Sequence, residues 1–252
     1  MEKINQFSLP RMFLLMKRHS IMNLKTWLIG FGALSGVLIV SALLQSYATG
    51  SFNVASLSST GISFIFIAGY LITSLAYNEI HTPARGQFYL ILPANTIEKL
   101  LSNWLLTSIV YILVAHVLLS LVLVIAGLLS TLIFSTHLEF YNPFTEAGFR
   151  NMGIYIVTQS VFFLGALYFR KNNMLKTLLS IFVIIVAIGT IAGLFGWIIL
   201  GEFNQINEES LPPQGLELFT VTIPHIAKIL FWGLTAPFFL IVSYFKLKER
   251  EV

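Results

Sequence analysis

The sequence predicts an all-α integral membrane protein, a single domain over residues 1–252 with six transmembrane helices. Two observations lead to this prediction. Hydrophobic residues make up 56% of the chain and charged residues only 10%, whereas a soluble domain carries about 25% charged residues. The uncharged residues also come in long blocks, and a helix needs only about 20 of them to cross about 30 Å of hydrocarbon.

The first uncharged block is long enough for two spans. Residues 26–78 carry no Asp, Glu, Lys or Arg, and the stretch 49–53 (TGSFN) interrupts them with turn-forming residues. We therefore expect a hairpin, with spans at about 26–47 and 55–77. Each remaining block suits one span, and these spans are expected at about 104–126, 152–169, 177–200 and 223–245.

The Lys and Arg residues predict the orientation. Cytoplasmic loops of membrane proteins are enriched in these residues, and thirteen of the fifteen lie on the same side of the predicted membrane as both termini. Only Arg150 and Lys228 lie on the other side. Both termini are therefore expected in the cytoplasm, and membrane topology explains the basic balance without a nucleic acid partner.

An amphipathic helix is predicted at about residues 8–24, before the first span. Arg11, Arg18 and Lys25 recur every seven positions on one helical face, and apolar residues fall opposite them. Such a helix lies in the interface of the inner leaflet. Arg11, Lys17 and Arg18 are its candidate contacts with membrane lipid or with a cytoplasmic partner. A simple basic anchor without a partner explains the segment equally well.

A second short helix is predicted in the cytoplasmic loop between the second and third spans. Thr82 before a proline is a typical helix start, and Pro93 ends the helix. Asn95 and Glu98 then have the spacing of a capping box, which starts a helix that runs into the membrane. The short helix exposes the apolar run 88–92 (FYLIL) on the cytoplasmic side, so either the membrane surface or a soluble partner must cover it.

The sequence lacks the residues that several function classes require. It contains no Asp, and the predicted spans contain no Glu, so the carboxylates of ion-coupled transporters are missing. Common hydrolase motifs and the phosphate-binding loop of nucleotide-binding proteins are also absent. We therefore expect no enzyme, no catalytic or metal-binding residue and no cofactor bound by this chain. His116, in the third span, is expected to hydrogen-bond within the helix bundle.

Small residues recur at four-residue spacing in two spans. Gly32 and Gly36 lie in the first span, and Gly189 and Gly193 lie in the fifth. This spacing lets two helices approach closely. The sequence allows that close packing either across a dimer or within the monomer.

Two stretches resemble a known family. Residues 92–105 (LPANTIEKLLSNWL) are similar to the LPAS..EK..S..L stretch that follows the second span of small bacterial ABC exporter permeases, whose ATPase is a separate chain. Asn95 replaces the usual Ser. Residues 164–177 (LGALYFRKNNMLKT) resemble the connection between the fourth and fifth spans of the same family. Together with the six spans, the likeness covers nearly the whole chain.

This resemblance implies the membrane-spanning subunit of an exporter in a bacterial inner membrane. Its partners would be an ABC ATPase subunit, which binds ATP and Mg²⁺, and a second permease copy or paralogue, and its cargo would be apolar or amphiphilic. The short helix would be the coupling helix that docks on the ATPase. The residues implied for that interface are Thr82, Arg85, Phe88, Tyr89, Leu92, Glu98 and Lys99.

Two other functions stay open from the sequence. A transporter of another class is disfavoured by the lack of carboxylates in the spans. A membrane sensor or immunity protein would transport nothing and would act through its cytoplasmic loop without an ATPase. The presence of an ATPase partner separates this last hypothesis from the exporter.

Overall fold

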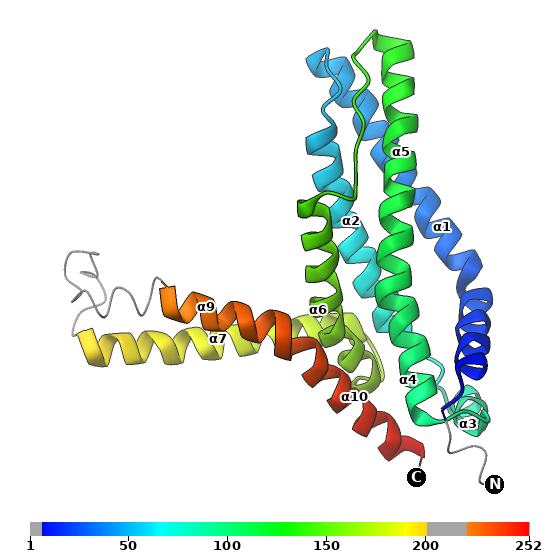
Figure 1. Ribbon diagram of the computed structural model, residues 1–252, viewed down its shortest axis with the longest axis vertical. Coiled ribbons are helices and arrows are strands. Elements are labelled where there is room, and N and C mark those ends of the chain that lie inside the picture. The colour runs from blue at the N-terminus through cyan, green and yellow to red at the C-terminus, as the bar shows by residue number, and fades with distance from the viewer. Residues whose placement is uncertain (1–6, 201–220, 252) are drawn as a thin grey trace.

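The structure is a computed structural model that describes residues 7–200 and 221–251. Within these ranges the chain is helical and forms no strand (Figure 1). The α-helices are α1 (Leu9–Thr49), α2 (Val54–Leu75), α3 (Pro83–Ile91), α4 (Thr96–Leu105), α5 (Tyr111–Phe134), α6 (Glu146–Tyr168), α7 (Asn173–Leu200), α9 (Ile223–Ile229) and α10 (Ala236–Glu251). Two π-helical segments, η2 (Leu106–Val110) and η5 (Leu230–Thr235), join neighbouring helices without a break.

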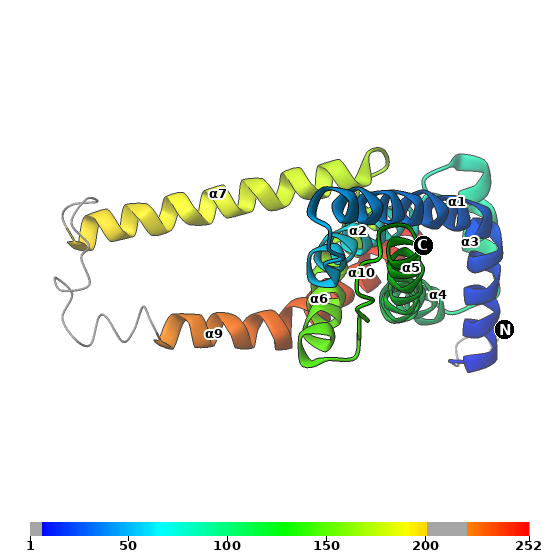
Figure 2. The same cartoon turned by 90° about the horizontal axis from the view of Figure 1, so that it is seen from above.

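Within residues 7–200 and 221–251, six helical stretches are long and apolar enough to cross a membrane, which is the number that the sequence predicts. Two of them extend far beyond the predicted spans. The predicted amphipathic helix and first span form one continuous helix, α1, whose first turns point in a different direction from the rest (Figure 2). The third stretch runs unbroken over Thr96–Phe134, because the helix starts at its cap and no proline interrupts it.

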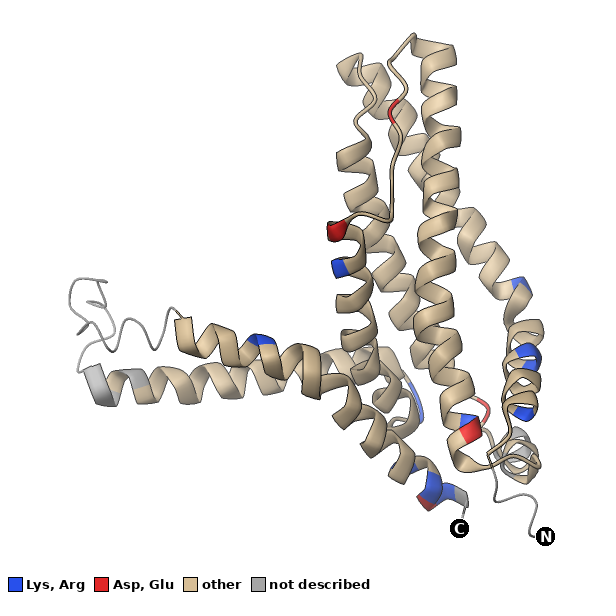
Figure 3. Ribbon diagram, viewed as in Figure 1, with Lys and Arg blue, Asp and Glu red and all other residues tan. Residues whose placement is uncertain are grey.

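The helices form a bundle and an arm. α1, α2, α5 and α6 lie side by side, while α7 and α9 both extend from the same side of this bundle and lie apart from each other (Figures 1 and 2). No residue in the most apolar stretch of α7 is buried. The Lys and Arg residues of α1 and α10 gather at the end of the molecule where the N- and C-terminal helices start and finish (Figure 3). This end, which also holds α3 and the start of α4, is called the basic end below.

The turn between α1 and α2 forms where the sequence predicts a hairpin. Gly50 adopts a left-handed conformation with a φ of 66°, which ends α1 with little steric cost. The Asn53 side chain accepts a hydrogen bond from the Ser56 backbone N–H at 3.0 Å and starts α2. Local turn chemistry therefore sets this boundary.

Aromatic side chains fill the centre of the bundle. Tyr155 is fully buried and stacks on Tyr70, which in turn stacks on Phe162 with ring centres 4.3 Å apart. Gly69 on α2 lies directly under the Tyr155 ring, so the absence of a side chain at this position lets α2 and α6 pack closely. A second apolar cluster, around Tyr77, Phe163 and Leu247, lies towards the basic end.

A polar network crosses the bundle at the π-helical segment η2. The Gln159 amide donates to the Thr73 hydroxyl at 3.1 Å and to the Thr107 hydroxyl at 3.0 Å. The Tyr155 hydroxyl donates to the Thr107 carbonyl at 2.8 Å. A π turn disturbs the regular backbone hydrogen bonding of a helix. The Tyr155 hydroxyl of α6 supplies a hydrogen bond to one backbone carbonyl of this turn.

His116 is buried in α5 but does not join this network. Its Nδ1 donates to the Ile112 carbonyl one turn earlier, at 2.9 Å. Its Nε2 has no hydrogen-bond partner in the part of the chain that the structure describes. His116 therefore forms a hydrogen bond inside the bundle, as expected, but the bond lies within α5 and does not join two helices.

Three of the four glycines with the four-residue spacing do not pack closely against another part of the monomer. A Cβ atom added at Gly32, Gly36 or Gly189 would meet no other atom within 4 Å. Gly193 is half-buried on α7. Close contacts between helices occur instead at other described glycines, including Gly69.

Gly69→Ala is expected to lower thermal stability, because its Cβ would collide with the rings of Tyr155 and Tyr111. Overpacking of this kind costs about 1–3 kcal/mol, and the helix propensity of Ala offsets about 1 kcal/mol. The melting temperature in detergent, followed by intrinsic fluorescence, measures the effect. Gly32→Ala is the matched control and should keep or raise the melting temperature. Equal stability of the two variants would contradict the close packing at Gly69.

Candidate functional site

The candidate site is the α3 segment, defined here as residues 79–98, which connects α2 to α4 at the basic end. Its helix begins at Pro83, directly after Thr82, as predicted. The Thr82 side chain does not cap the helix, so that part of the prediction is wrong. Its hydroxyl donates instead to the Glu79 carbonyl at 2.9 Å, within the turn before α3. The helix ends at Ile91, two residues before Pro93.

The start of α4 is a capping box, as the sequence predicts. The Asn95 side chain accepts from the backbone of the first helical turn, and the Glu98 carboxylate accepts from the Asn95 backbone N–H at 3.1 Å. These bonds satisfy amide groups that a helix start otherwise leaves without partners. The end of the α3 segment is therefore fixed by local sequence.

The Glu98 carboxylate also binds the first turn of α1. Glu98 is fully buried, and its Oε1 accepts from the Ser8 backbone N–H at 2.6 Å and from the Arg11 guanidinium at 2.8 Å. The Arg11 side chain is 27% exposed. One carboxylate thus holds together the start of α1, the loop after α3 and the start of α4.

A second ion pair joins α1 to the other end of the α3 segment. The Arg18 guanidinium donates to the Glu79 carboxylate at 2.9 Å. Arg11 and Arg18 are seven residues apart and lie on one face of α1, and their partners Glu98 and Glu79 flank α3. The predicted basic face of α1 therefore contacts its own chain through two of its three members.

Lys17 is placed differently from these two arginines. Its side chain is exposed on α1, as are the apolar side chains of Phe13, Leu14 and Ile21. The first turns of α1 therefore turn a largely apolar side away from the protein, and Lys17 is exposed there as well. The sequence predicts contacts of Arg11 and Arg18 with lipid or a partner, whereas in the structure both side chains pair with glutamates of their own chain.

Two large apolar side chains are exposed on α3, among the α3 residues whose side chains the structure describes. Phe88 is 75% exposed and Ile91 is 78% exposed, and the two are three residues apart on one side of the helix. Leu92 is half-buried against the second apolar cluster. Ile91 was absent from the residues implied by the resemblance, although its spacing from Phe88 would have identified it.

Three of the implied interface residues lie beneath this surface. Tyr89 is buried, and its hydroxyl accepts from the Asn103 side chain at 3.1 Å. Lys99 is buried with its ammonium group 5.8 Å from the centre of the Tyr89 ring. Together with the buried Glu98, these residues support the α3 segment from below. The backbone of Arg85 belongs to α3, and its side chain lies outside the described residues.

His81 connects the α3 segment to α6 and α10. Its Nε2 donates to the Ala166 carbonyl at 2.8 Å, and its Nδ1 accepts from the Arg250 guanidinium at 3.1 Å. Arg250 also donates to the Leu167 carbonyl at 2.9 Å. Because each ring nitrogen has a fixed role, the ring is neutral in this arrangement. Burial lowers the pKa of His81, with contributions from the positive charges of Arg250 and Arg170.

The described residues contain no group of three or more His, Cys, Asp or Glu side chains arranged to hold a metal ion. The acidic side chains of the site, Glu79 and Glu98, are both engaged with arginines. The site is an exposed apolar surface, Phe88 and Ile91, on a segment whose two ends are held by ion pairs to α1.

Glu98→Ala is expected to lower the free energy of unfolding by about 2 kcal/mol. Removing one partner of a buried ion pair costs about 3–5 kcal/mol, and the partial exposure of Arg11 reduces this value. Glu79→Ala is the matched control, because its more exposed pair contributes at most about 1 kcal/mol. Melting temperatures in detergent test the order of the two effects. A larger loss for Glu79→Ala would show that Glu98 does not organise the basic end.

The His81 contacts are expected to make stability depend on pH. Since the folded-state pKa of His81 is lowered, its contribution to stability is complete above the unfolded pKa of about 6.5. That contribution is lost as the pH falls below this value, because the unfolded chain binds the proton more readily. Comparing melting temperatures at pH 7.5 and 5.5 measures the loss. His81→Gln should reduce the difference, whereas His137→Gln, which changes an exposed histidine, should preserve it.

Comparison of the chain with protein-family models, with curated proteins and with solved structures found no match. The family resemblance therefore rests on the two motifs and on the order of the spans.

Proposed function

We propose that this chain is the membrane-spanning permease subunit of an ATP-driven ABC exporter whose ATPase is a separate polypeptide. The observation that carries the proposal is the construction of the α3 segment. A short helix exposes Phe88 and Ile91 at the basic end, and ion pairs to a single helix, α1, hold both ends of its segment. Such a surface is suited to receive a partner and to pass on its movement.

The proposal assigns the basic end to the cytoplasm, following the enrichment of Lys and Arg on the cytoplasmic side of membrane proteins. Both termini are then cytoplasmic, in the inner membrane of a bacterium. The first turns of α1 lie along the inner leaflet, where exposed Phe13, Leu14 and Ile21 contact lipid and Lys17 reaches the headgroups.

In this mechanism α3 is the coupling helix. Phe88 and Ile91 insert into an apolar groove of the ATPase, which binds ATP and Mg²⁺. Closure of two ATPase subunits moves the α3 segment, and the ion pairs of Glu98 and Glu79 transmit that movement to α1. A change in the relative stability of inward-open and outward-open states then follows, without chemistry in this chain.

A second permease copy or paralogue completes the exporter, and the cargo path lies between the two copies. Its walls are formed by the apolar and small residues of α1, α2 and α7. The glycines of α1 and α7 that pack against nothing in the monomer, Gly32, Gly36 and Gly189, support close packing in such an assembly. The cargo is apolar or amphiphilic.

Phe88→Asp is expected to reduce co-purification of the ATPase at least about tenfold, because a charge replaces an apolar anchor at the centre of the interface. Ile91→Asp should act in the same way, and Arg85→Glu should also weaken docking. The amount of ATPase recovered with the tagged chain in mild detergent measures the effect. Phe140→Asp is the matched control, since Phe140 is 71% exposed outside the basic end.

The outcome also separates the two functional hypotheses. Loss of ATPase with Phe88→Asp and Ile91→Asp, but not with Phe140→Asp, supports the exporter. Equal recovery from all three variants would contradict the docking role of α3. If the wild-type chain purifies without any ATPase, the exporter proposal fails, and a membrane sensor or immunity protein acting through the same loop becomes the better hypothesis.

A further inference from the structure

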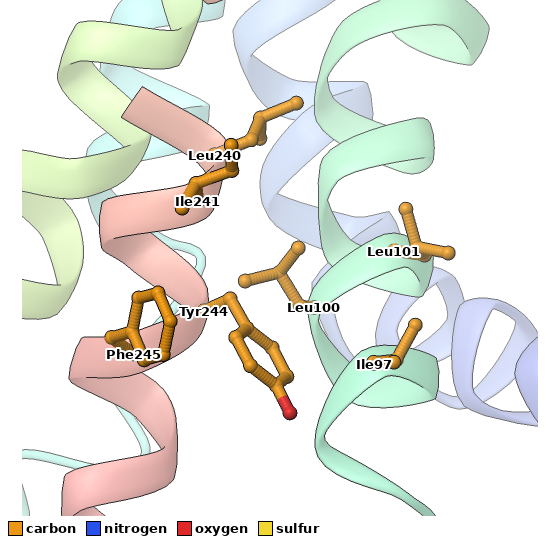
Figure 4. A pocket seen from close by; sticks show the side chains of 7 residues that line it. All are labelled: Ile97, Leu100, Leu101, Leu240, Ile241, Tyr244 and Phe245. Atoms are coloured by element: carbon orange, nitrogen blue, oxygen red, sulfur yellow. The ribbon is translucent and has the colours of Figure 1, made fainter. Parts of the chain in front are cut away.

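An open apolar groove lies between α4 and α10 near the basic end. Its volume is about 320 Å³, at the lower end of the range of about 300–1,000 Å³ for ligand pockets. Side chains from the two helices face each other across it (Figure 4). The residues that line it are Ile97, Leu100 and Leu101 from α4, and Leu240, Ile241, Tyr244 and Phe245 from α10.

The groove has a buried floor and exposed rims. Leu100 is buried and lies between the helices, whereas Ile97, Ile241 and Phe245 are exposed. The groove therefore opens sideways, where apolar side chains of both helices face the surroundings of the protein. In a membrane, that direction is the lipid.

Polarity rises along the groove towards the C-terminus of α10. The Tyr244 ring lies between the two helices, and its hydroxyl points in the direction of the last turns of α10 (Figure 4). Lys248 follows one turn later, on the same face as Ile241 and Tyr244. It is exposed and forms no ion pair within the described part of the chain, whereas the nearby Lys246 pairs with Glu249 at 2.7 Å.

We propose that this groove binds one acyl chain of an anionic phospholipid of the inner leaflet, with the lipid phosphate held by Lys248. The apolar wall, the interfacial tyrosine and the ammonium group follow one another in the order of the parts of such a lipid. Anionic lipids are enriched in the cytoplasmic leaflet, where basic side chains attract them.

The order of groups along the groove favours a lipid over a protein partner. The apolar wall, the Tyr244 hydroxyl and the exposed Lys248 follow one another as the acyl chain and the charged headgroup of a lipid do. The proposal uses the cytoplasmic placement of the basic end and does not depend on an ATPase partner, so it can fail or succeed separately from the exporter proposal.

The test uses the full chain in nanodiscs of phosphatidylcholine with a small amount of phosphatidylglycerol that carries a photoactivatable group in one acyl chain. After irradiation, mass spectrometry should locate adducts on residues 97–101 and 240–245. Lys248→Glu should reduce their yield at least about fivefold, as expected for one basic residue near an anionic lipid. Lys171→Glu, which changes an exposed lysine of the α6–α7 connection, is the matched control and should not.

A groove-filling variant and a neutral probe complete the experiment. Ile241→Trp should reduce labelling at α4 by both photoactivatable phosphatidylglycerol and photoactivatable phosphatidylcholine, because it occupies the space of the chain. Lys248→Glu should affect only the anionic probe. Equal labelling by both probes in the wild type, unchanged by Lys248→Glu, would overturn the proposal. A disulfide between Ile97→Cys of one copy and Phe245→Cys of another would also overturn it, because a second copy would then cover the groove.

Discussion

The arrangement of the basic end depends on the buried carboxylate of Glu98. A buried carboxylate without hydrogen-bond partners carries a large desolvation penalty. Here three N–H donors offset that penalty: the Ser8 backbone, the Arg11 guanidinium and the Asn95 backbone. The position of Glu98 in the first turn of α4 adds a favourable interaction with the helix dipole. The same group therefore fixes where α1 begins, where the α3 segment ends and where α4 enters the apolar region.

α4 brings two surfaces of different character together. Glu98 faces α1 through charge-assisted hydrogen bonds, whereas its neighbour Ile97 lines the groove shared with α10. The helix then continues through η2, where Thr107 meets donors from α6. The helix that starts at Thr96 therefore contacts α1, α10 and α6 directly.

Local features of this fold were predictable from sequence, and contacts between distant residues were not. The hairpin at Gly50, the capping box at Asn95 and the helix boundary at Pro93 each depend on a few neighbouring residues. The pairing of Arg11 with Glu98 joins positions 87 residues apart, and no periodicity in the sequence encodes it. The burial of Tyr89 was not predictable either, because the apolar run 88–92 does not reveal which side of α3 faces the protein.

α7 is held at its junction with α6, and its apolar stretch extends beyond these contacts. The Thr177 side chain rests against Gly165, and the Asn173 side chain donates to the Ser74 carbonyl at 3.0 Å, so the first turns of α7 are held while its apolar stretch is unburied. With 28 residues, α7 is about 42 Å long, and a rotation of only about 5° at the junction moves its far end by about 4 Å. A small change at these two contacts would therefore displace the far end of α7 by a much larger distance.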